Sequence, residues 1–317
     1  MKSCMVRRVF AMMALSSAAA LFACAADKAT GVDAQAAADA VKAEARLFEA
    51  MNKDNFAAAG DIVGELNDLR ERDPTNYRNT FIFGAANFWW IAEAARPDAG
   101  VDPLLIISLS IPNILSAWPD VIQNDPKNAG GAEALLGAFL SDAGFDKKTG
   151  STLVDTAAKY APHVGIFQQM SIRRFAAADD STTAQSVEYG FKWWEWCLGA
   201  PIDRNNPDFT GKVKAPTDGP YGFCWGSARV PHGYEGAWMM LGDLLVKSGN
   251  LKVARRAYEN ATLGVNYSRW KHKPDLEQRL ASNLAQRAAT YASHDPANWA
   301  PIGNTQYGCT QCHASKQ

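Results

Sequence analysis

The chain has 317 residues, of which 32 are Lys or Arg and 33 are Asp or Glu, so its formal net charge is −1. A protein that holds nucleic acid by its phosphates needs a basic face, and this balance argues against such a partner. The length is enough to bury a large hydrophobic core, in one elongated domain or two compact ones.

Residues 1–23 predict a secretory signal peptide. Lys2, Arg7 and Arg8 precede an apolar stretch, residues 9–23, that is too short and too rich in alanine to be a good membrane span. Removing residues 1–23 leaves 29 basic residues (32 less three) and 33 acidic ones, so the mature chain has a charge near −4. We therefore expect an exported protein in an oxidising compartment.

The end of this segment, Leu21-Phe22-Ala23-Cys24, resembles the lipobox of bacterial lipoproteins. The resemblance implies that Cys24 becomes the acylated first residue, and Ala25 after it is similar to the family's pattern for the outer membrane. The acyl chains would anchor a soluble body at the membrane. Ordinary cleavage near Ala25 or Ala26 is the alternative, since Phe22 departs from the small residues usual at its position.

An alanine-rich tether, residues 24–40, is expected to lead into a helical domain over residues 41–295. From Val41 to Arg72 the apolar residues recur at helical spacing, and Lys53-Asp54-Asn55 divides the stretch into two helices. Asp73-Pro74 ends the second helix, and another is predicted from Tyr77 to about Arg96.

Residues 103–119 are uncharged, but Pro112 and the short length make them a poor membrane span. We expect a buried or groove-lining helix there. Further helices are predicted over residues 135–140 and 152–160, and an aromatic helix over residues 185–197. The Trp89-Trp90 pair and the tryptophans at 193–196 could line a ligand groove, pack against a cofactor, or simply form core.

The stretch from Gly199 to Gly233 lacks helical periodicity and is expected to be a long functional loop. Cys197 lies just before this loop, and Cys224 lies within it. Of the six cysteines, these two are left after the signal peptide, the lipobox and the C-terminal pair are accounted for, and they fit a disulfide that staples the loop. Such a bridge would restrict the unfolded chain by roughly 3–4 kcal/mol.

Residues 238–261 resemble a tetratricopeptide repeat, a partner-binding helical hairpin. The matching positions are Trp238, Leu241, Gly242, Leu245, Gly249, Ala254, Tyr258 and Ala261. The resemblance implies an all-α protein built as a repeat array (an α-solenoid), with small residues where paired helices approach closely. Asn266 replaces the family's closing proline, and a second repeat over residues 41–74 is only suggested by the pattern.

The C-terminal region, residues 296–317, follows a predicted helix over residues 275–291 and is expected to be an irregular arm. It carries Cys309-Thr310-Gln311-Cys312-His313, the attachment pattern of c-type haem. The two thiols would bond the haem vinyl groups, and His313 would be the proximal iron ligand. A terminal disulfide or half of a zinc site are the alternatives. The motif resembles c-type cytochromes over these five residues alone.

A sixth iron ligand is not fixed by any spacing. His232, in the long loop, is the preferred candidate, and an open iron position is equally compatible with the motif. The other candidates are histidines and methionines scattered along the chain: His163, His272, His294, Met170, Met239 and Met240.

The leading hypothesis is an outer-membrane lipoprotein with one haem c that serves electron transfer, or that acts as a scaffold for a redox partner or a multi-subunit cytochrome complex. A non-redox repeat adaptor for a transport or envelope assembly is the main alternative, and a peroxidase-like haem enzyme the third. Nucleophile elbows, phosphate loops and dinucleotide fingerprints are missing from the sequence. Whether the protein is an enzyme is left open, and a carrier or scaffold is favoured.

Overall fold

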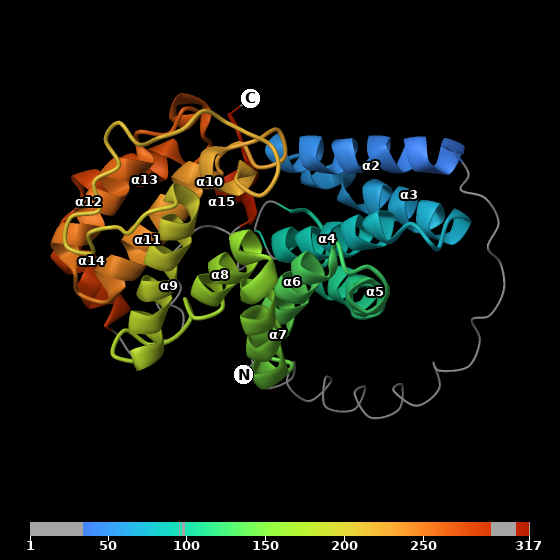
Figure 1. Ribbon diagram of the computed structural model, residues 1–317, viewed down its shortest axis with the longest axis horizontal. Helices are drawn as coiled ribbons and strands as arrows, with labels where there is room; N and C mark the ends of the chain where they lie inside the picture. The colour runs from blue at the N-terminus through green and yellow to red at the C-terminus, as the bar shows by residue number, and fades with distance from the viewer. Residues whose placement is uncertain (1–33, 95, 97–98, 293–308, 317) are drawn as a thin grey trace. The chain divides into compact units, whose positions relative to one another are not determined.

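The computed structural model describes residues 34–94, 96, 99–292 and 309–316 (Figure 1). These residues form helices and no strand, which confirms the predicted all-α class; a single antiparallel bridge joins Trp270 to Ser315. The predicted signal peptide, Cys24, His294 and residues 296–308 of the arm lie outside the described residues.

The first helices follow the predicted breaks. Helix α2 (Ala34–Asn52) is followed by the short η1 (Phe56–Ala58), α3 (Ala59–Arg72) and α4 (Tyr77–Ala94). Asp54 takes a left-handed conformation, with φ 52°, which the helix cannot accommodate and which separates α2 from η1. The expected tether to residue 40 is too long, because α2 already begins at Ala34 and buries Ala36.

The middle of the chain forms α5 (Pro103–Asn124), α6 (Ala129–Asp142), α7 (Lys147–Tyr160) and α8 (Pro162–Ser171). The side chain of Asp102 caps α5 by accepting a hydrogen bond from the Leu104 N–H at 2.9 Å. By length and composition α5 is the one helix of the described chain that could cross a membrane, although such a helix alone is weak evidence for a span.

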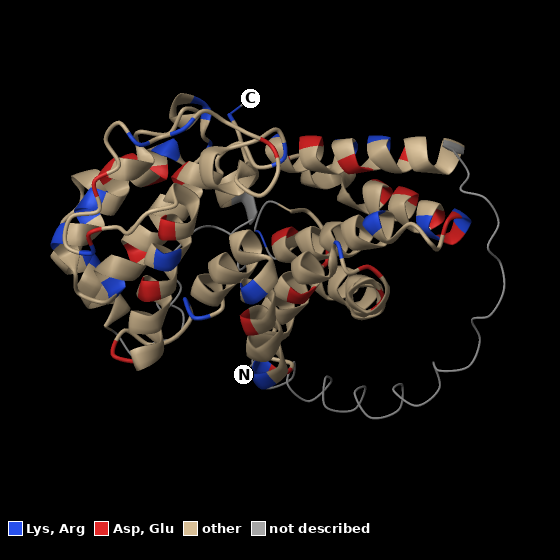
Figure 2. Cartoon of the chain, in the orientation of Figure 1, with Lys and Arg blue, Asp and Glu red and all other residues tan. Residues whose placement is uncertain are grey.

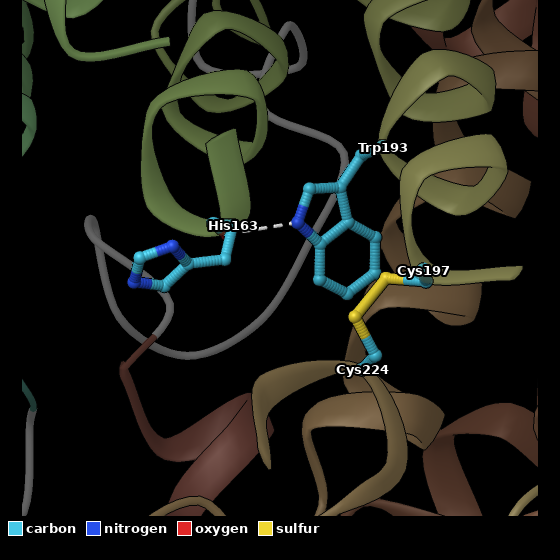
Figure 3. Close-up of a disulfide and its surroundings, with 4 residues drawn as sticks. All are labelled: His163, Trp193, Cys197 and Cys224. Atoms are coloured by element: carbon cyan, nitrogen blue, oxygen red, sulfur yellow. Dashed lines mark hydrogen bonds between the residues drawn. A yellow bond between two sulfur atoms is a disulfide. The ribbon is translucent and has the colours of Figure 1, made fainter. Parts of the chain in front are cut away.

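The C-terminal half is built from α9 (Ser181–Leu198), the single turn α10 (Gly222–Trp225), α11 (Gly233–Lys247) and α12 (Leu251–Ala261). A disulfide joins Cys197 at the end of α9 to Cys224 in α10, with Cα atoms 5.7 Å apart (Figure 3). The loop from Gly199 contains only α10 as regular structure. Trp194 and Trp238 stack in the core of this half at 4.5 Å between ring centroids.

The hairpin of α11 and α12 has the close approach that its sequence predicts. A Cβ atom on Gly242 would lie 2.3 Å from the Tyr258 ring, so only glycine fits there. Gly249 makes the turn at φ 81°, and the Asn250 side chain accepts from the Val253 N–H at the start of α12. From α2 to α9 each helix packs on the next one along the chain.

After η2 (Tyr267–Arg269) the predicted helix over residues 275–291 is divided into α13 (Lys273–Ala281) and α14 (Leu284–Tyr291). The single long helix is therefore wrong. Ser282 is extended, and the Asn283 side chain accepts from the Ala285 N–H at 3.0 Å. Ser and Asn favour such caps over helix interiors because their side chains compete for backbone hydrogen bonds.

Candidate functional site

The predicted haem-attachment motif forms one helical turn, α15 (Cys309–His313), followed by Ala314, Ser315 and Lys316. Positions three apart in a helix lie on the same side, so positions 309 and 312 share a face of this turn. The C-terminal arm, predicted to be irregular, is therefore helical over the motif. It also packs on the helical domain, against α2, α4 and α11.

Backbone hydrogen bonds tie this segment to distant parts of the chain. The Ser315 N–H donates to the Asn52 carbonyl at 2.8 Å, and the His232 N–H donates to the Cys312 carbonyl at 2.9 Å. The Trp270 indole N–H donates to the Gln311 carbonyl at 2.7 Å. The end of α2, the start of α11 and the chain after η2 thus hold the motif in place. None of these neighbours is close to it in sequence.

Cys312 is buried against the first turns of α11. A Cβ atom on Gly236 would lie 2.6 Å from its Sγ, so glycine at 236 is what admits the thiol. Burial, with a smaller contribution from Glu235, raises the pKa of Cys312 to about 12. At neutral pH this thiol is protonated and a poor nucleophile.

His313 faces the end of α2. Its Nδ1 lies 3.3 Å from Oδ1 of Asn52, and its ring stacks near Phe48 with centroids 6.2 Å apart. Burial lowers the pKa of His313 to about 4. The ring is therefore neutral at pH 7, the form in which imidazole binds a metal.

His232, the preferred sixth-ligand candidate, lies against the motif segment. It is only 1% exposed, and its Nε2 hydrogen-bonds the Ser315 hydroxyl at 2.8 Å. Its Nδ1 has no hydrogen-bond partner in the described chain and lies 4.0 Å from Oε2 of Glu235. Burial lowers the pKa of His232 to about 4, so this imidazole is also neutral at pH 7.

The other candidate ligands divide into two groups. His272 lies close to the motif, since its ring is 6.0 Å from that of Trp270, which holds Gln311. His163 lies elsewhere: its ring is 6.0 Å from that of Trp196, and its carbonyl accepts from the Trp193 indole at 2.9 Å (Figure 3). The three methionines are buried in the aromatic core of the C-terminal half: Met170, Met239 and Met240.

Four buried polar atoms around the motif have no hydrogen-bond partner within the described chain: His232 Nδ1, Glu235 Oε1, His272 Nε2 and Gln311 Oε1. Native proteins leave few such atoms unpaired, so a water molecule or another polar group is the expected partner of these four. Burial raises the pKa of Glu235 to about 7. No cluster of three metal-binding side chains is found among the described residues.

Sequence reasoning missed Glu235 and Gln311. Gln311 stands inside the motif as one of its variable positions, and its amide donates to the Gly236 carbonyl. Glu235 follows His232 by three residues, which sets both on one side of the start of α11. That spacing was the available signal, but acidic residues in a first helical turn are common and usually exposed.

The tryptophans are largely core. Trp89, Trp193 and Trp194 are buried, and Trp196 is partly exposed and stacks on Tyr221 at 4.7 Å between ring centroids. The disulfide lies beside this aromatic cluster (Figure 3). Trp193, Trp194 and Trp196 therefore stabilise the fold of the C-terminal half, whereas Trp89 belongs to the core formed by α2, α3 and α4.

The chain matches no protein-family model, no curated protein and no solved structure. Its function has to be argued from its residues and their arrangement.

Proposed function

We propose that the chain is an exported lipoprotein, anchored to the outer membrane through Cys24, that carries one c-type haem on Cys309 and Cys312. Its task would be electron transfer, or the support of a cytochrome complex. The observation that carries this assignment is the motif Cys309–His313, in which scarce residue types occupy the three positions that haem attachment requires. Bound haem would supply a one-electron iron couple.

Several residues of the site suit a haem. His313 offers a neutral imidazole as the proximal ligand, and His232 offers a second one beside the same segment. His232 Nδ1 is a buried ring nitrogen without a partner, which is the property expected of a group awaiting a ligand or hydrogen-bond acceptor. Because the imidazoles of His313 and His232 are largely shielded from solvent, the site would favour electron transfer over the exchange of small ligands on iron.

One contact constrains when the haem is attached. The Cys312 side chain is only 6% exposed and its Sγ packs against Gly236 of α11, so the sulfur is not accessible to haem in this arrangement. Attachment therefore requires the segment to be free of α11, and the haem-bearing arrangement differs from the described one at this contact. A buried, protonated thiol would also react slowly.

The helical body would serve as the docking platform for a redox partner protein. The α11–α12 hairpin has the close approach at Gly242 and the turn at Gly249 that a tetratricopeptide-like repeat requires. The sequential packing of α2 to α9 suits an α-solenoid, in which each element contacts its chain neighbours. Such arrays present extended surfaces to partners rather than catalytic clefts.

Haem staining and the reduced absorption spectrum of the protein, matured with the c-type haem machinery, test this function. We expect covalent haem in the wild type and none in the Cys309→Ala/Cys312→Ala variant. The Cys197→Ser/Cys224→Ser variant is the matched control and should keep its haem. An unstained wild type with Cys309 and Cys312 joined in a disulfide would refute the assignment.

A non-redox adaptor lipoprotein is the second candidate, and the packing of Cys312 favours it. The docked segment is held by backbone hydrogen bonds to Asn52 and His232, which are contacts within the protein itself. This candidate requires the Cys309→Ala/Cys312→Ala variant to bind the same partners as the wild type, measured by co-purification. Loss of those partners together with the haem would favour the cytochrome role.

A further inference from the structure

Helix α5 has an unusual outward face. Four leucines on it are between 45% and 61% exposed: Leu104, Leu105, Leu109 and Leu115. Val101, just before the helix, is 40% exposed and extends the face. Between Pro103 and Pro119 the sequence contains no charged residue, in contrast to the charges that Figure 2 shows on α2 and α3.

The exposed residues form one continuous face. They recur at intervals of one, three or four positions, interleaved with Ser108, Pro112, Ser116 and Pro119, all exposed as well. These spacings follow one side of an α-helix. A surface helix of a soluble protein ordinarily presents charged side chains there, so this face is suited to an apolar neighbour.

The opposite side fixes α5 to the body. Trp118 is fully buried, and its indole N–H donates to the Phe81 carbonyl at 3.3 Å. It lies so close to α4 that a Cβ atom on Gly84 would be 2.4 Å from its Nε1. Asn113 also donates to the Asn87 side chain at 3.0 Å. Crossing a bilayer would expose these groups to lipid, so α5 stays on the body and offers only its outer face.

The lipid anchor proposed above indicates that a membrane surface is the apolar neighbour of this face. Cys24 precedes Ala34, the start of α2, by ten residues (34 − 24). A chain of that length reaches at most roughly 35 Å. Acyl chains on Cys24 would thus keep the body within a short distance of one lipid surface, where an exposed leucine face gains most from burial.

Resting on that lipid anchor, we infer that α5 is a monotopic membrane contact, whose leucine face lies in the interface of the bilayer that holds Cys24. The helix lies along the surface and does not cross it. Its ends are marked by Asp102 and Asp120, which limit how far the apolar part extends. With no cation on the face, binding needs no anionic lipid and is insensitive to salt.

The test separates the helix from the anchor. The described helices, from Ala34 onward, form one compact unit, so a chain exported behind a signal peptide without a lipobox, and beginning at Ala25, keeps the whole body but no acyl group. We expect it to float with phosphatidylcholine vesicles, equally in low and high salt. The Leu104→Glu/Leu109→Glu variant should bind at least about tenfold more weakly.

Val41→Glu/Val265→Glu is the matched control, because these valines are 69% and 59% exposed and lie outside α5. Its binding should equal that of the wild type, and circular dichroism should show all variants folded. Absence of vesicle binding, equal binding by the α5 variant, or a dimer that the α5 substitutions abolish without any vesicle binding would overturn the inference. Acylation of Cys24, measured by mass on the full chain, tests the anchor separately.

Discussion

Helices α5 and α11 are both apolar, yet they occupy opposite environments. Every residue of α11 is buried, including Glu235, Asp243 and Lys247. Helix α5 is uncharged over most of its length but buries one side only. The reason is the number of neighbours: α9, α10, α12, α14 and α15 surround α11, whereas α5 packs on α4 and α6.

Two of the buried charged side chains of α11, Asp243 and Lys247, have hydrogen-bond partners. Asp243 receives two hydrogen bonds from Arg279, at 2.9 and 3.0 Å, and one from the Tyr258 hydroxyl at 2.5 Å. Lys247 donates to the Arg174 carbonyl at 2.9 Å. Burial therefore depends on what the tertiary structure supplies around a helix, and mean hydropathy is a poor guide to it.

The largest effect is expected at the buried ion pair of α11. Asp243→Ala leaves the Arg279 guanidinium buried without its carboxylate, which should cost about 3–5 kcal/mol in the free energy of unfolding. Urea denaturation measures this cost. Asp68→Ala, at an exposed position of α3, is the control and should change stability by less than about 0.5 kcal/mol. Similar costs at both positions would contradict the role of burial.

The same leucine truncation on the two helices compares them directly. Leu244 is fully buried in α11, so Leu244→Ala should lower the free energy of unfolding by about 2–5 kcal/mol through lost burial and a cavity. Leu104→Ala on α5 should cost no more than about 0.5 kcal/mol, because that side chain is mostly in solvent. A large cost at Leu104 would mean that the face is covered by another part of the chain.

Two glycine-to-alanine substitutions test the close packing of α11 on α12, with an exposed glycine of α3 as the reference. Gly242→Ala places a Cβ atom against the Tyr258 ring and should destabilise the protein by about 1–3 kcal/mol. Gly64→Ala, in α3, meets no atom within 4 Å and should stabilise it by about 0.5–1 kcal/mol. Thermal and chemical denaturation should each show that the two substitutions change stability in opposite directions. A stabilising Gly242→Ala would show that α11 and α12 can move apart.

The last prediction concerns the pH dependence of stability at α4, the helix on which α5 packs. Burial raises the pKa of Glu93 in α4 to about 7, against the opposing charge of Arg96. Between about pH 4.5 and 7 the unfolded carboxyl is ionised while the folded one keeps its proton, so stability falls as the pH rises, by about 1.4 kcal/mol per pH unit. The stability of wild type relative to Glu93→Gln should show this slope, and a pH-independent difference would contradict it.

Local patterns accounted for much of the fold. The break near Asp54, the turn at Gly249 and the close approach at Gly242 all follow from residue types at short spacing. The division between α13 and α14 was missed, because the apolar period continues across Ser282 and Asn283 and hides two residues that favour a cap. Periodicity indicates which residues are helical better than it indicates where a helix stops.

By itself, the sequence determined the all-α class, the motif Cys309–His313 and the spacing of the α11–α12 hairpin, because each depends on residues a few positions apart. Only the tertiary structure decided that His232 lies against the motif, that Cys312 is enclosed at Gly236, and that the leucines of α5 face outward. Those arrangements join residues that are far apart in sequence. They depend on how all the helices pack together, which no local spacing encodes.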